Sequence, residues 1–280
     1  MGKNNYYPIY DLDQELPVYV FGIGVGHAQE EKNHYNPPKR ILLHLTITGC
    51  GIAEIDGKRH MLTPGTLLIT PPGKNLSIAP TPLGWTDNWI GLHIESLTPE
   101  MLKAMNLSTE PMLLRPQNPG RLAEIYTNVS RLLTTKTIQS RFEAAAEGYK
   151  LLVQAISAAI LGTEPPTTSE SRIVLCLTSY IDDHLDEKLT LVRLGEVSGN
   201  LSRQYLCRIF KKQTGLTIGD YILEHRIAKA KDLLTNTDLS IGEIAVMIGL
   251  ESESYFYRSW KRTESDSPSE YRRTHRNLFV

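Results

Sequence analysis

Hydrophobic and polar positions divide this chain into a strand-rich first part and a helical second part. From Val18 to Ile94, apolar runs such as ILLHLTI, GIAEI, TLLIT and NWIGLHI are separated by the turn signals GCG, DGK, TPG and PPGK. Short apolar runs bounded by Gly and Pro are typical of β-strands. Many such strands at close spacing predict an antiparallel sandwich or barrel.

Helical spacing of apolar residues begins at about Arg121 and continues to Leu161. It predicts two helices with a break near Thr134–Ile138. The next segment, GTEPPTTSES, is rich in Pro, Thr and Ser and predicts an interdomain linker. We therefore expect one domain over residues 1–162, a linker over 163–171 and a helical domain over 172–280. The positions expected to face inward are Leu122, Ile125, Val129 and Leu132, then Phe142, Ala145, Tyr149, Leu152 and Ile156.

The helical part repeats itself at an offset of fifty residues. Thr190 and Ser240 are expected N-cap residues, and Ser240 forms a capping box with Glu243. A short helix, a turn at Gly199 or Gly249, and a second helix follow in each copy. Further matching pairs are Ser202 and Ser252, Tyr205 and Tyr255, Arg208 and Arg258, Phe210 and Trp260, and Tyr221 and Tyr271.

This order of elements is that of a helix-turn-helix motif. The second helix of such a motif enters the major groove, where its early exposed side chains meet base edges. One amphipathic helix from Ile218 to Leu234 joins the two copies, which predicts contacts with major-groove segments ~34 Å apart and direct-repeat sites. The positions expected to be buried are Leu191, Leu194, Val197, Tyr205, Leu206, Ile209 and Phe210, then Ile241, Ile244, Ile248, Tyr255, Phe256 and Trp260.

Bulk composition changes this picture little. The net charge is −1, so no basic excess marks the expected DNA-binding domain. No apolar run approaches the ~20 residues of a membrane-spanning helix, and the start lacks an apolar signal-peptide core. We expect a cytoplasmic protein with no membrane contact. The cysteines Cys50, Cys176 and Cys207 lie far apart and predict neither a disulfide framework nor a zinc site.

Several motifs of the helical part follow one another in order: Leu201-Ser202-x2-Tyr205-Leu206-x-Arg208-x-Phe210-Lys211-Lys212-x2-Gly215, Arg226-Ile227-x2-Ala230-x2-Leu233-Leu234, Ile241-x2-Ile244-Ala245-x3-Gly249 and Ser267-Pro268-Ser269-Glu270-Tyr271-Arg272. Over about residues 172–273 they resemble the AraC/XylS family of transcription regulators. Leu250 and Trp260 stand where that family usually has Phe, and both keep an apolar core. Ser265 stands where the second copy usually has Gly.

The resemblance implies which side chains meet DNA. An Arg with bidentate contacts to a guanine edge contributes ~1–3 kcal/mol of discrimination, whereas phosphate contacts position the protein. The first reading helix also exposes Arg203 and is the more cationic of the two. For any single Lys or Arg, an ordinary solvated helix face is the alternative. The expected base-reading residues are Gln204, Cys207, Arg208, Glu253, Ser254, Tyr257 and Arg258, and the expected phosphate contacts are Lys211, Lys212, Lys261 and Arg262.

The β-rich part carries a second set of motifs: Leu43-His44-Leu45-Thr46-Ile47-x-Gly49-x-Gly51, Pro64-Gly65-x-Leu67-Leu68-x2-Pro71-Pro72-Gly73 and Trp85-x3-Trp89-Ile90. They resemble the sugar-sensing barrel of the same family. The implied fold is α+β and multidomain: an N-terminal cupin-like antiparallel β-barrel with a helical dimerisation segment, then an all-α double helix-turn-helix domain.

The resemblance also implies an effector site at His34, Ile78, Asp87 and Trp89, to which Trp85 is added. An indole face stacks on the C–H face of a sugar ring, and a carboxylate binds its hydroxyls. We therefore expect a mono- or oligosaccharide effector. His34 and Ile78 stand where family members use Arg and Tyr, so the sugar is expected to differ. For the two Trp residues, a place in the barrel core or rim is the alternative.

The N-terminal arm Asn4–Leu16 is aromatic and apolar, and either covers a bound ligand, as in the family, or forms an edge strand. A homodimer through the helices of Arg121–Leu161 is implied, as is contact with RNA polymerase if the protein is an activator. Two alternatives stay open: a ligand-independent dimeric regulator, and a cupin-type sugar enzyme fused to a DNA-binding domain.

A metal-dependent cupin needs a His-x-His pair and a further His after the Pro-x-Gly turn. His44 has no partner two residues away, and Lys74-Asn75 follows that turn. No metal, cofactor or catalytic residue is therefore predicted, and the protein is not expected to be an enzyme.

Overall fold

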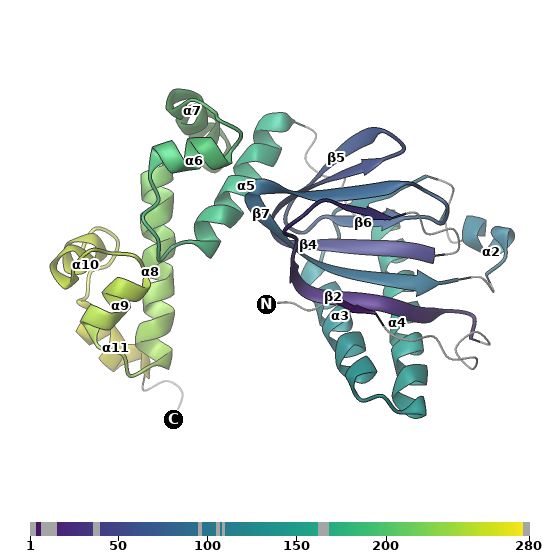
Figure 1. The fold of residues 1–280 in the computed structure, drawn as a ribbon. Helices are drawn as coiled ribbons and strands as arrows, with labels where there is room; N and C mark the ends of the chain where they lie inside the picture. Colours follow the sequence, from purple (N-terminus) through teal and green to yellow (C-terminus); the bar gives the residue numbers. More distant parts are fainter. Residues whose placement is uncertain are drawn as a thin grey trace. The chain divides into compact units, whose positions relative to one another are not determined.

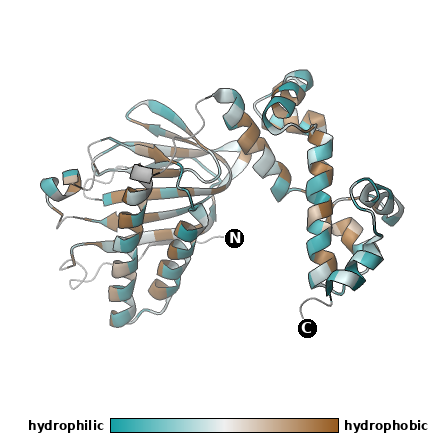
Figure 2. Cartoon of the chain, turned by 180° about the vertical axis from the view of Figure 1, so that it is seen from behind, coloured by the Kyte–Doolittle hydropathy of each residue, from teal (hydrophilic) through white to brown (hydrophobic). Residues whose placement is uncertain are grey.

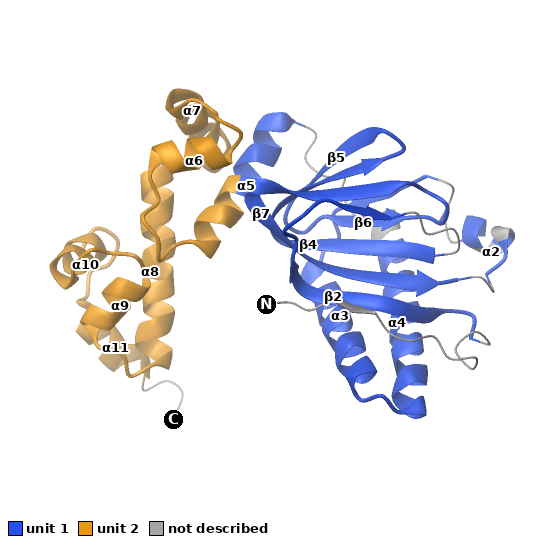
Figure 3. Cartoon of the chain, in the orientation of Figure 1, with its two compact units in different colours: residues 1–176 blue, residues 177–280 orange. Residues whose placement is uncertain are grey.

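The structure is a computed structural model that describes residues 4–6, 16–35, 40–94, 97–104, 107, 110–161 and 168–276. Two compact units divide the chain, residues 1–176 and residues 177–280 (Figure 3). Unit 1 combines an antiparallel sheet with helices, and unit 2 is helical, so the predicted multidomain α+β architecture is confirmed. In the described ranges, no helix has the length and apolar character needed to cross a membrane.

One eight-stranded antiparallel sheet is the framework of unit 1 (Figure 1). Its strand order is β1-β2-β7-β4-β6-β8, with β3 paired to β7 and β5 to β4. The short strand β1 belongs to the N-terminal arm and pairs with β2 at the sheet edge, while residues 7–15 of the arm lie outside the described residues. The strands are β1 (Asn4–Tyr6), β2 (Tyr19–Ala28), β3 (Asn33–Tyr35), β4 (Arg40–Ile55), β5 (Lys58–Leu62), β6 (Leu67–Thr70), β7 (Leu76–His93) and β8 (Met112–Leu114).

Glycine allows the two central strands to bend. β4 and β7 pair along nearly their whole length, with register shifts between Thr46 and Thr48 and between Gly49 and Gly51. Gly49 has a φ of +64°, and a Cβ atom there would lie 2.3 Å from the carbonyl oxygen of Gly84. Only glycine fits such a bend. The sheet curls there, so that residues from both halves of β4 share one core.

Strand alternation gives β4 two buried faces. Ile41, Leu43 and Leu45 pack in a core that includes residues of the helices α3 and α4. Leu42 and Ala53 belong to the other core, inside the curl of the sheet. Burial on both faces explains why the first half of this strand reads as one continuous apolar run, interrupted only by a histidine and a threonine.

Helices α3 (Pro119–Thr134) and α4 (Ile138–Leu161) lie against one face of the sheet (Figure 1). The break predicted between them is confirmed. The Asn118 side chain accepts a hydrogen bond from the Arg121 N–H and caps α3. The expectation that one face of α4 is wholly buried is wrong in part, because Phe142 is 41% exposed and Tyr149 is 39% exposed.

Helix α2 (Pro99–Ala104) is short, and helix α5 (Ser169–Asp183) follows the segment expected to be a linker. Because α5 begins at Ser169, the end of that expected linker is helical. Residues 162–167 lie outside the described residues. The boundary between the two units falls within α5, after Cys176.

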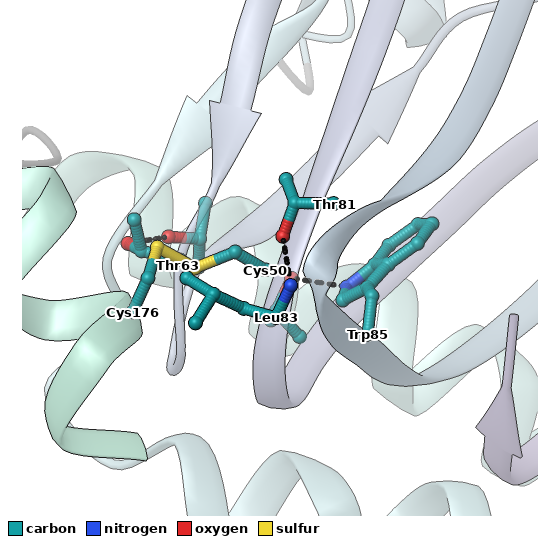
Figure 4. The surroundings of a disulfide bond; sticks show 8 residues. Cys50, Thr63, Thr81, Leu83, Trp85 and Cys176 are labelled. Carbon is teal, nitrogen blue, oxygen red and sulfur yellow. Dashed lines mark hydrogen bonds between the residues drawn. A yellow bond between two sulfur atoms is a disulfide. The ribbon is translucent and has the colours of Figure 1, made fainter. Parts of the chain in front are cut away.

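Cys50 on β4 and Cys176 on α5 form a disulfide bond, with Cα atoms 5.6 Å apart (Figure 4). The prediction of no disulfide is therefore wrong. The two residues are separated by 126 positions, and only the tertiary fold brings them within disulfide range. Cys207 is a free cysteine.

Two helix-turn-helix motifs joined by the helix α8 (Ile218–Asn236) form unit 2, which confirms the predicted repeat. Hydrophobic and hydrophilic residues alternate along α8 (Figure 2). Its buried residues fall on two sides of the helix, Ile218 and Ile222 on one and Ile227, Ala230 and Leu234 on the other, so the prediction of a single apolar face is wrong. The other helices are α6 (Leu191–Val197) and α7 (Arg203–Thr214) in the first motif, α9 (Ile241–Met247) and α10 (Glu253–Trp260) in the second, and α11 (Pro268–Arg276).

The predicted helix caps are confirmed. The Ser240 hydroxyl accepts from the Glu243 N–H, and the Glu243 carboxylate accepts from the Ser240 N–H at 2.7 Å. These bonds from Ser240 lower the pKa of Glu243. The side chains of Thr190, Ser202 and Ser252 cap α6, α7 and α10 in the same manner.

The expected core of unit 2 is correct for most positions, including Leu250 and Trp260. Five expectations are wrong: Tyr255 is 44% exposed, Leu191 is 38% exposed, and Val197, Tyr205 and Ile241 are only half-buried. The reason is that the short helices α6 and α9 and the start of α10 lie at the surface of the motifs.

Trp260 does more than fill the place of a phenylalanine. Its indole Nε1 donates a hydrogen bond to the carbonyl oxygen of Asp266 at 2.7 Å. Phenylalanine has no such donor. The bond holds the turn that contains Ser265, where the family usually has Gly.

Candidate DNA-binding and effector sites

The residues expected to read bases lie along α7 and α10. Arg203, Gln204 and Arg208 are exposed on α7, as are Glu253, Ser254 and Arg258 on α10, whereas Cys207 and Tyr257 are half-buried.

Each arginine that is expected to read bases stacks on a tyrosine of its own helix. The Arg208 guanidinium lies 5.0 Å from the ring centroid of Tyr205, and that of Arg258 lies 5.8 Å from the ring centroid of Tyr255. Cation–π contact of this kind restricts the arginine rotamers. The two arginines are therefore held in corresponding places of the two motifs.

The expected phosphate contacts are not equivalent. Lys211 and Lys212 are exposed in the last turn of α7, and Lys261 is exposed at the end of α10. Arg262 instead forms an ion pair with Asp220, with N and O atoms 3.4 Å apart. A DNA phosphate must therefore compete with the Asp220 carboxylate for Arg262. The acidic side chain of Glu253, at the start of α10, reduces the positive charge of that helix further.

A half-buried arginine of α8 holds together parts of unit 2 that are distant in the sequence. Arg226 of α8 donates from Nε to the Leu185 carbonyl at 2.9 Å and from Nη2 to the Glu187 carbonyl at 2.7 Å. Burial lowers the pKa of this guanidinium. Gly249, in the turn of the second motif, lies against the same Leu185 carbonyl and Arg226 side chain. One arginine therefore joins α8, the segment after α5 and the second turn.

A second polar contact fixes α5 to α8 within unit 2. Asp182 pairs with His225 at 2.6 Å and accepts a hydrogen bond from the Tyr221 hydroxyl at 3.3 Å. Burial raises the pKa of Asp182. Burial, and then the charge of Asp182, also raises the pKa of Tyr221.

A chain of hydrogen-bonded polar side chains, all buried except the half-buried Asn33, crosses the inner face of the sheet in unit 1. His44 Nδ1 lies 2.7 Å from Asp87 Oδ2, and the Gln29 amide donates to Asp87 Oδ1 at 3.3 Å. Asn33 donates to the Gln29 side-chain oxygen at 2.9 Å. His44 is 1% exposed and Asp87 is fully buried. A buried carboxylate with these partners is oriented for hydrogen bonding.

Aromatic rings surround His44. Trp89 is its cross-strand partner on β7, and the ring centroids of Trp89 and Trp85 each lie 6.4 Å from that of His44. Tyr35 lies 6.2 Å away on the same measure. Trp85 donates from Nε1 to Thr46 Oγ1 at 3.2 Å. We refer to His44, Asp87, Trp89, Trp85 and Gln29 as the inner cluster.

Two buried polar atoms in or next to this cluster have no hydrogen-bond partner in the described structure: His44 Nε2, and Nδ1 of His27, which is paired with Asp87 between β2 and β7. Buried polar groups are normally hydrogen-bonded, so such atoms require an explanation. A ligand hydroxyl would satisfy either one. Trp85 also packs with Ile78 in the apolar core. It is therefore a core residue that lies at the border of the inner cluster.

The structure brings three of the five expected effector residues together, Asp87, Trp89 and Trp85, places Ile78 next to Trp85 in the apolar core, and places His34 outside the cluster. Ile78 is buried in the apolar core. His34 is exposed on β3 and lines an open hollow of about 470 Å³ with polar neighbours such as Lys32 and Glu54.

Reasoning from sequence missed His44 and Gln29. His44 was considered only as a metal ligand, and nothing singled out Gln29. The available signal was a histidine and a threonine at alternate positions in an otherwise apolar strand, which places both on one face. Their pairing with Asp87 and Trp89 depends on the register of β4 against β7, which the sequence does not reveal.

No group of three His, Cys, Asp or Glu side chains in the described part of the chain is close enough to hold a metal ion.

Comparison with known proteins gives two family matches. A model described as an AraC-like ligand binding domain matches residues 17–152, and a helix-turn-helix domain model matches residues 199–274. The chain is 25% identical over 274 residues to the arabinose operon regulatory protein of Salmonella typhimurium, covering 93% of this chain and 96% of that protein. It is 26% identical over 287 residues to the Msm operon regulatory protein of Streptococcus mutans, covering 96% of this chain and 99% of that protein.

The helical part has a further relative. It is 36% identical over 104 residues to the regulatory protein SoxS of Escherichia coli, covering 37% of this chain and 96% of that protein. A ligand-binding β domain followed by two helix-turn-helix motifs defines a ligand-responsive DNA-binding transcription regulator. The chain belongs to the AraC family of these regulators.

Proposed function

We propose that this regulator senses a sugar, and that the inner cluster is its binding site. The observation that carries the proposal is the buried His44–Asp87 pair between the rings of Trp89 and Trp85. Indole faces stack on sugar C–H groups, while the carboxylate and the imidazole bind hydroxyls. The arabinose operon regulatory protein among the relatives supports this ligand class. Since the cluster is buried, binding includes a local opening of unit 1.

A thermal-shift screen of mono- and oligosaccharides tests this site. A ligand that binds only the folded protein stabilises it, by ~2.7 kcal/mol at a hundredfold excess over Kd. The rise in Tm for the best sugar is expected to disappear in Trp89→Leu and to persist in His34→Ala, because His34 lies in the open hollow outside the cluster. A sugar whose shift depends on His34 and not on Trp89 contradicts the proposed location, and a panel without any shift contradicts sugar sensing.

We propose that α7 contributes more to DNA affinity than α10. Both helices present one stacked arginine, but α7 also exposes Arg203, Lys211 and Lys212, whereas α10 begins with Glu253. The greater positive charge of α7 attracts the DNA phosphates more strongly and holds this helix closer to the duplex. Arg208 is therefore better placed than Arg258 to reach a guanine edge.

Arg208→Ala is therefore expected to weaken binding to a direct-repeat duplex about tenfold, ~1.4 kcal/mol, and Arg258→Ala to weaken it less. Fluorescence anisotropy at one fixed salt concentration measures both. Lys103→Ala, which removes one positive charge from α2 in unit 1, is the control for net charge. Equal losses for the two arginines, or the reverse order, contradict the proposal.

We propose that the protein forms a homodimer through α4. Ile138, Phe142, Tyr149 and Val153 are 67%, 41%, 39% and 40% exposed. Their spacing of four, seven and four residues places them along one side of the helix. In an antiparallel pair of α4 helices, Ile138 meets Val153 and Phe142 meets Tyr149, because the four residues are symmetric about Ala145–Ala146. A two-fold dimer requires such a self-complementary surface.

Phe142→Arg is expected to weaken dimerisation at least tenfold, because it places a charge in the centre of this apolar stripe. Analytical ultracentrifugation measures the dissociation constant. The matched control is Gln139→Arg, which adds the same charge on an exposed position of the same helix away from the stripe. An unchanged dimer in Phe142→Arg, or equal weakening in the control, places the interface elsewhere.

A further inference from the structure

The Cys50–Cys176 disulfide fixes the middle of α5 to the sheet of unit 1 (Figure 4). Cys176 is the last residue of unit 1, and Leu177 is the first of unit 2. Beyond the bridge, α5 makes its contacts with unit 2, where Tyr180 accepts a hydrogen bond from Arg193 at 3.1 Å. With the bridge in place, the chain is covalently anchored to the sheet at the residue directly before the DNA-binding unit.

The bridge lies at the bend of β4. Gly51, the next residue after Cys50, packs so closely under Trp85 that a Cβ atom there would lie 2.4 Å from the indole ring. Cys50 is fully buried and Cys176 is 2% exposed. A thiol therefore reaches these sulfur atoms only when the first turns of α5 open locally, so exchange is expected to be slow.

We propose that this disulfide is a redox-operated clamp on the DNA-binding unit. In the oxidised protein the clamp holds α5 on the sheet. Reduction releases it, so that α5 is then joined to the sheet by the backbone and by non-covalent contacts alone. The inference rests on the dimer proposed above. Its functional consequence is that the two DNA-binding units of a dimer reach both sites of a direct repeat only when the disulfide is reduced.

The reaction is thiol–disulfide exchange with a low-molecular-weight monothiol. One thiolate attacks Cys176 Sγ, the S–S bond breaks, and Cys50 leaves as a thiolate that takes up a proton. A second thiolate attacks the mixed disulfide and releases Cys176, which is protonated in turn. The protein disulfide gains two electrons and two protons, and the two monothiols become one small disulfide. The same small disulfide reverses the reaction.

Effective concentration explains why the release matters. Two linked binding modules gain avidity only if their connection spans both sites, and the gain is lost when it does not. Lengthening the connection therefore raises affinity for a two-site duplex and leaves affinity for one site unchanged. A clamp therefore changes the affinity for the two-site duplex alone. A general effect of reduction on folding or on Cys207 would change the affinity for the one-site duplex as well.

The experiment uses full-length protein in glutathione redox buffers and a two-site duplex selected by the reduced protein from a random library. Alkylation in denaturant followed by peptide mass spectrometry is expected to show a Cys50–Cys176 linked peptide in the oxidised state. Reduction is expected to raise affinity for the two-site duplex at least tenfold, and to change affinity for the one-site version less than twofold. Cys176→Ser, and Cys50→Ser as an independent second variant, are expected to match reduced wild type in every buffer.

Several outcomes overturn the clamp. They are the absence of a linked peptide at any glutathione ratio, equal two-site affinities in the two states, and a redox response that persists in Cys176→Ser. Ultracentrifugation in both states shows separately whether the dimer exists. If it does not, amide hydrogen exchange of residues 169–176 decides: faster exchange on reduction supports the clamp, and unchanged exchange overturns it.

Discussion

Gly249→Ala is expected to lower the free energy of unfolding of the DNA-binding unit by about 3 kcal/mol. Gly249 has a φ of +72°, where a side chain costs about 1 kcal/mol. A Cβ atom would also lie 2.3 Å from the Leu185 carbonyl oxygen and 2.6 Å from Arg226 Nη2. Backbone cannot move away cheaply, and overpacking of this kind costs a further ~1–3 kcal/mol. Chemical denaturation followed by circular dichroism measures the loss.

The repeat supplies the control. Gly199 occupies the corresponding turn of the first motif with a φ of +91°, but a Cβ atom there meets nothing within 4 Å. Gly199→Ala is therefore expected to lower the free energy of unfolding by only about 1 kcal/mol, the cost of a side chain at a positive φ. If the two substitutions cost the same, the packing of the second turn against Arg226 is not what requires glycine there.

Asp87→Ala is expected to lower the free energy of unfolding of unit 1 by about 3 kcal/mol and to abolish sugar binding. The substitution leaves His44 Nδ1 and the Gln29 amide buried without an acceptor. Removing one partner of a buried polar pair costs ~3–5 kcal/mol, because the remaining group keeps its desolvation penalty. Thermal and chemical denaturation measure stability, and the sugar-induced shift in Tm measures binding.

Glu54→Ala is the matched control for Asp87→Ala. Glu54 also lies on the sheet and carries an ion pair, with Arg59 at 3.2 Å, but the Arg59 side chain is 77% exposed. Exposed pairs contribute ~0–1 kcal/mol. Asp87→Asn adds a further comparison, since it keeps one acceptor oxygen, replaces the other by an NH2 donor and removes the charge. If Asp87→Ala lowers the free energy of unfolding no more than Glu54→Ala does, the buried hydrogen bonds of Asp87 do not stabilise unit 1.

The two candidate sites differ in how much of them the sequence could predict. Each reading helix is a local structure: Ser202 or Ser252 caps it, and helical spacing separates Leu206 or Phe256 inside from the exposed arginine outside. Local periodicity therefore predicted that most of the residues proposed to bind DNA are exposed on α7 and α10.

The inner cluster is a non-local structure. Asp87 and Trp89 were expected from resemblance, but their partner His44 is 43 positions from Asp87, and Gln29 is 58 positions away. The bend at Gly49 and the register shifts of β4 against β7 decide which side chains meet. Strand pairing has no short-range signature that fixes such a register.

What the sequence by itself determined is the order of elements, the repeat with its caps and glycine turns, and the family. Those features arise from hydrogen bonds and packing between residues a few positions apart, which a linear pattern records. Only the tertiary structure decided that Phe142 and Tyr149 lie at the surface, that His44 meets Asp87, and that Cys50 meets Cys176 across 126 positions. Each depends on where a curled sheet places distant segments, and no periodicity along the chain encodes that distance.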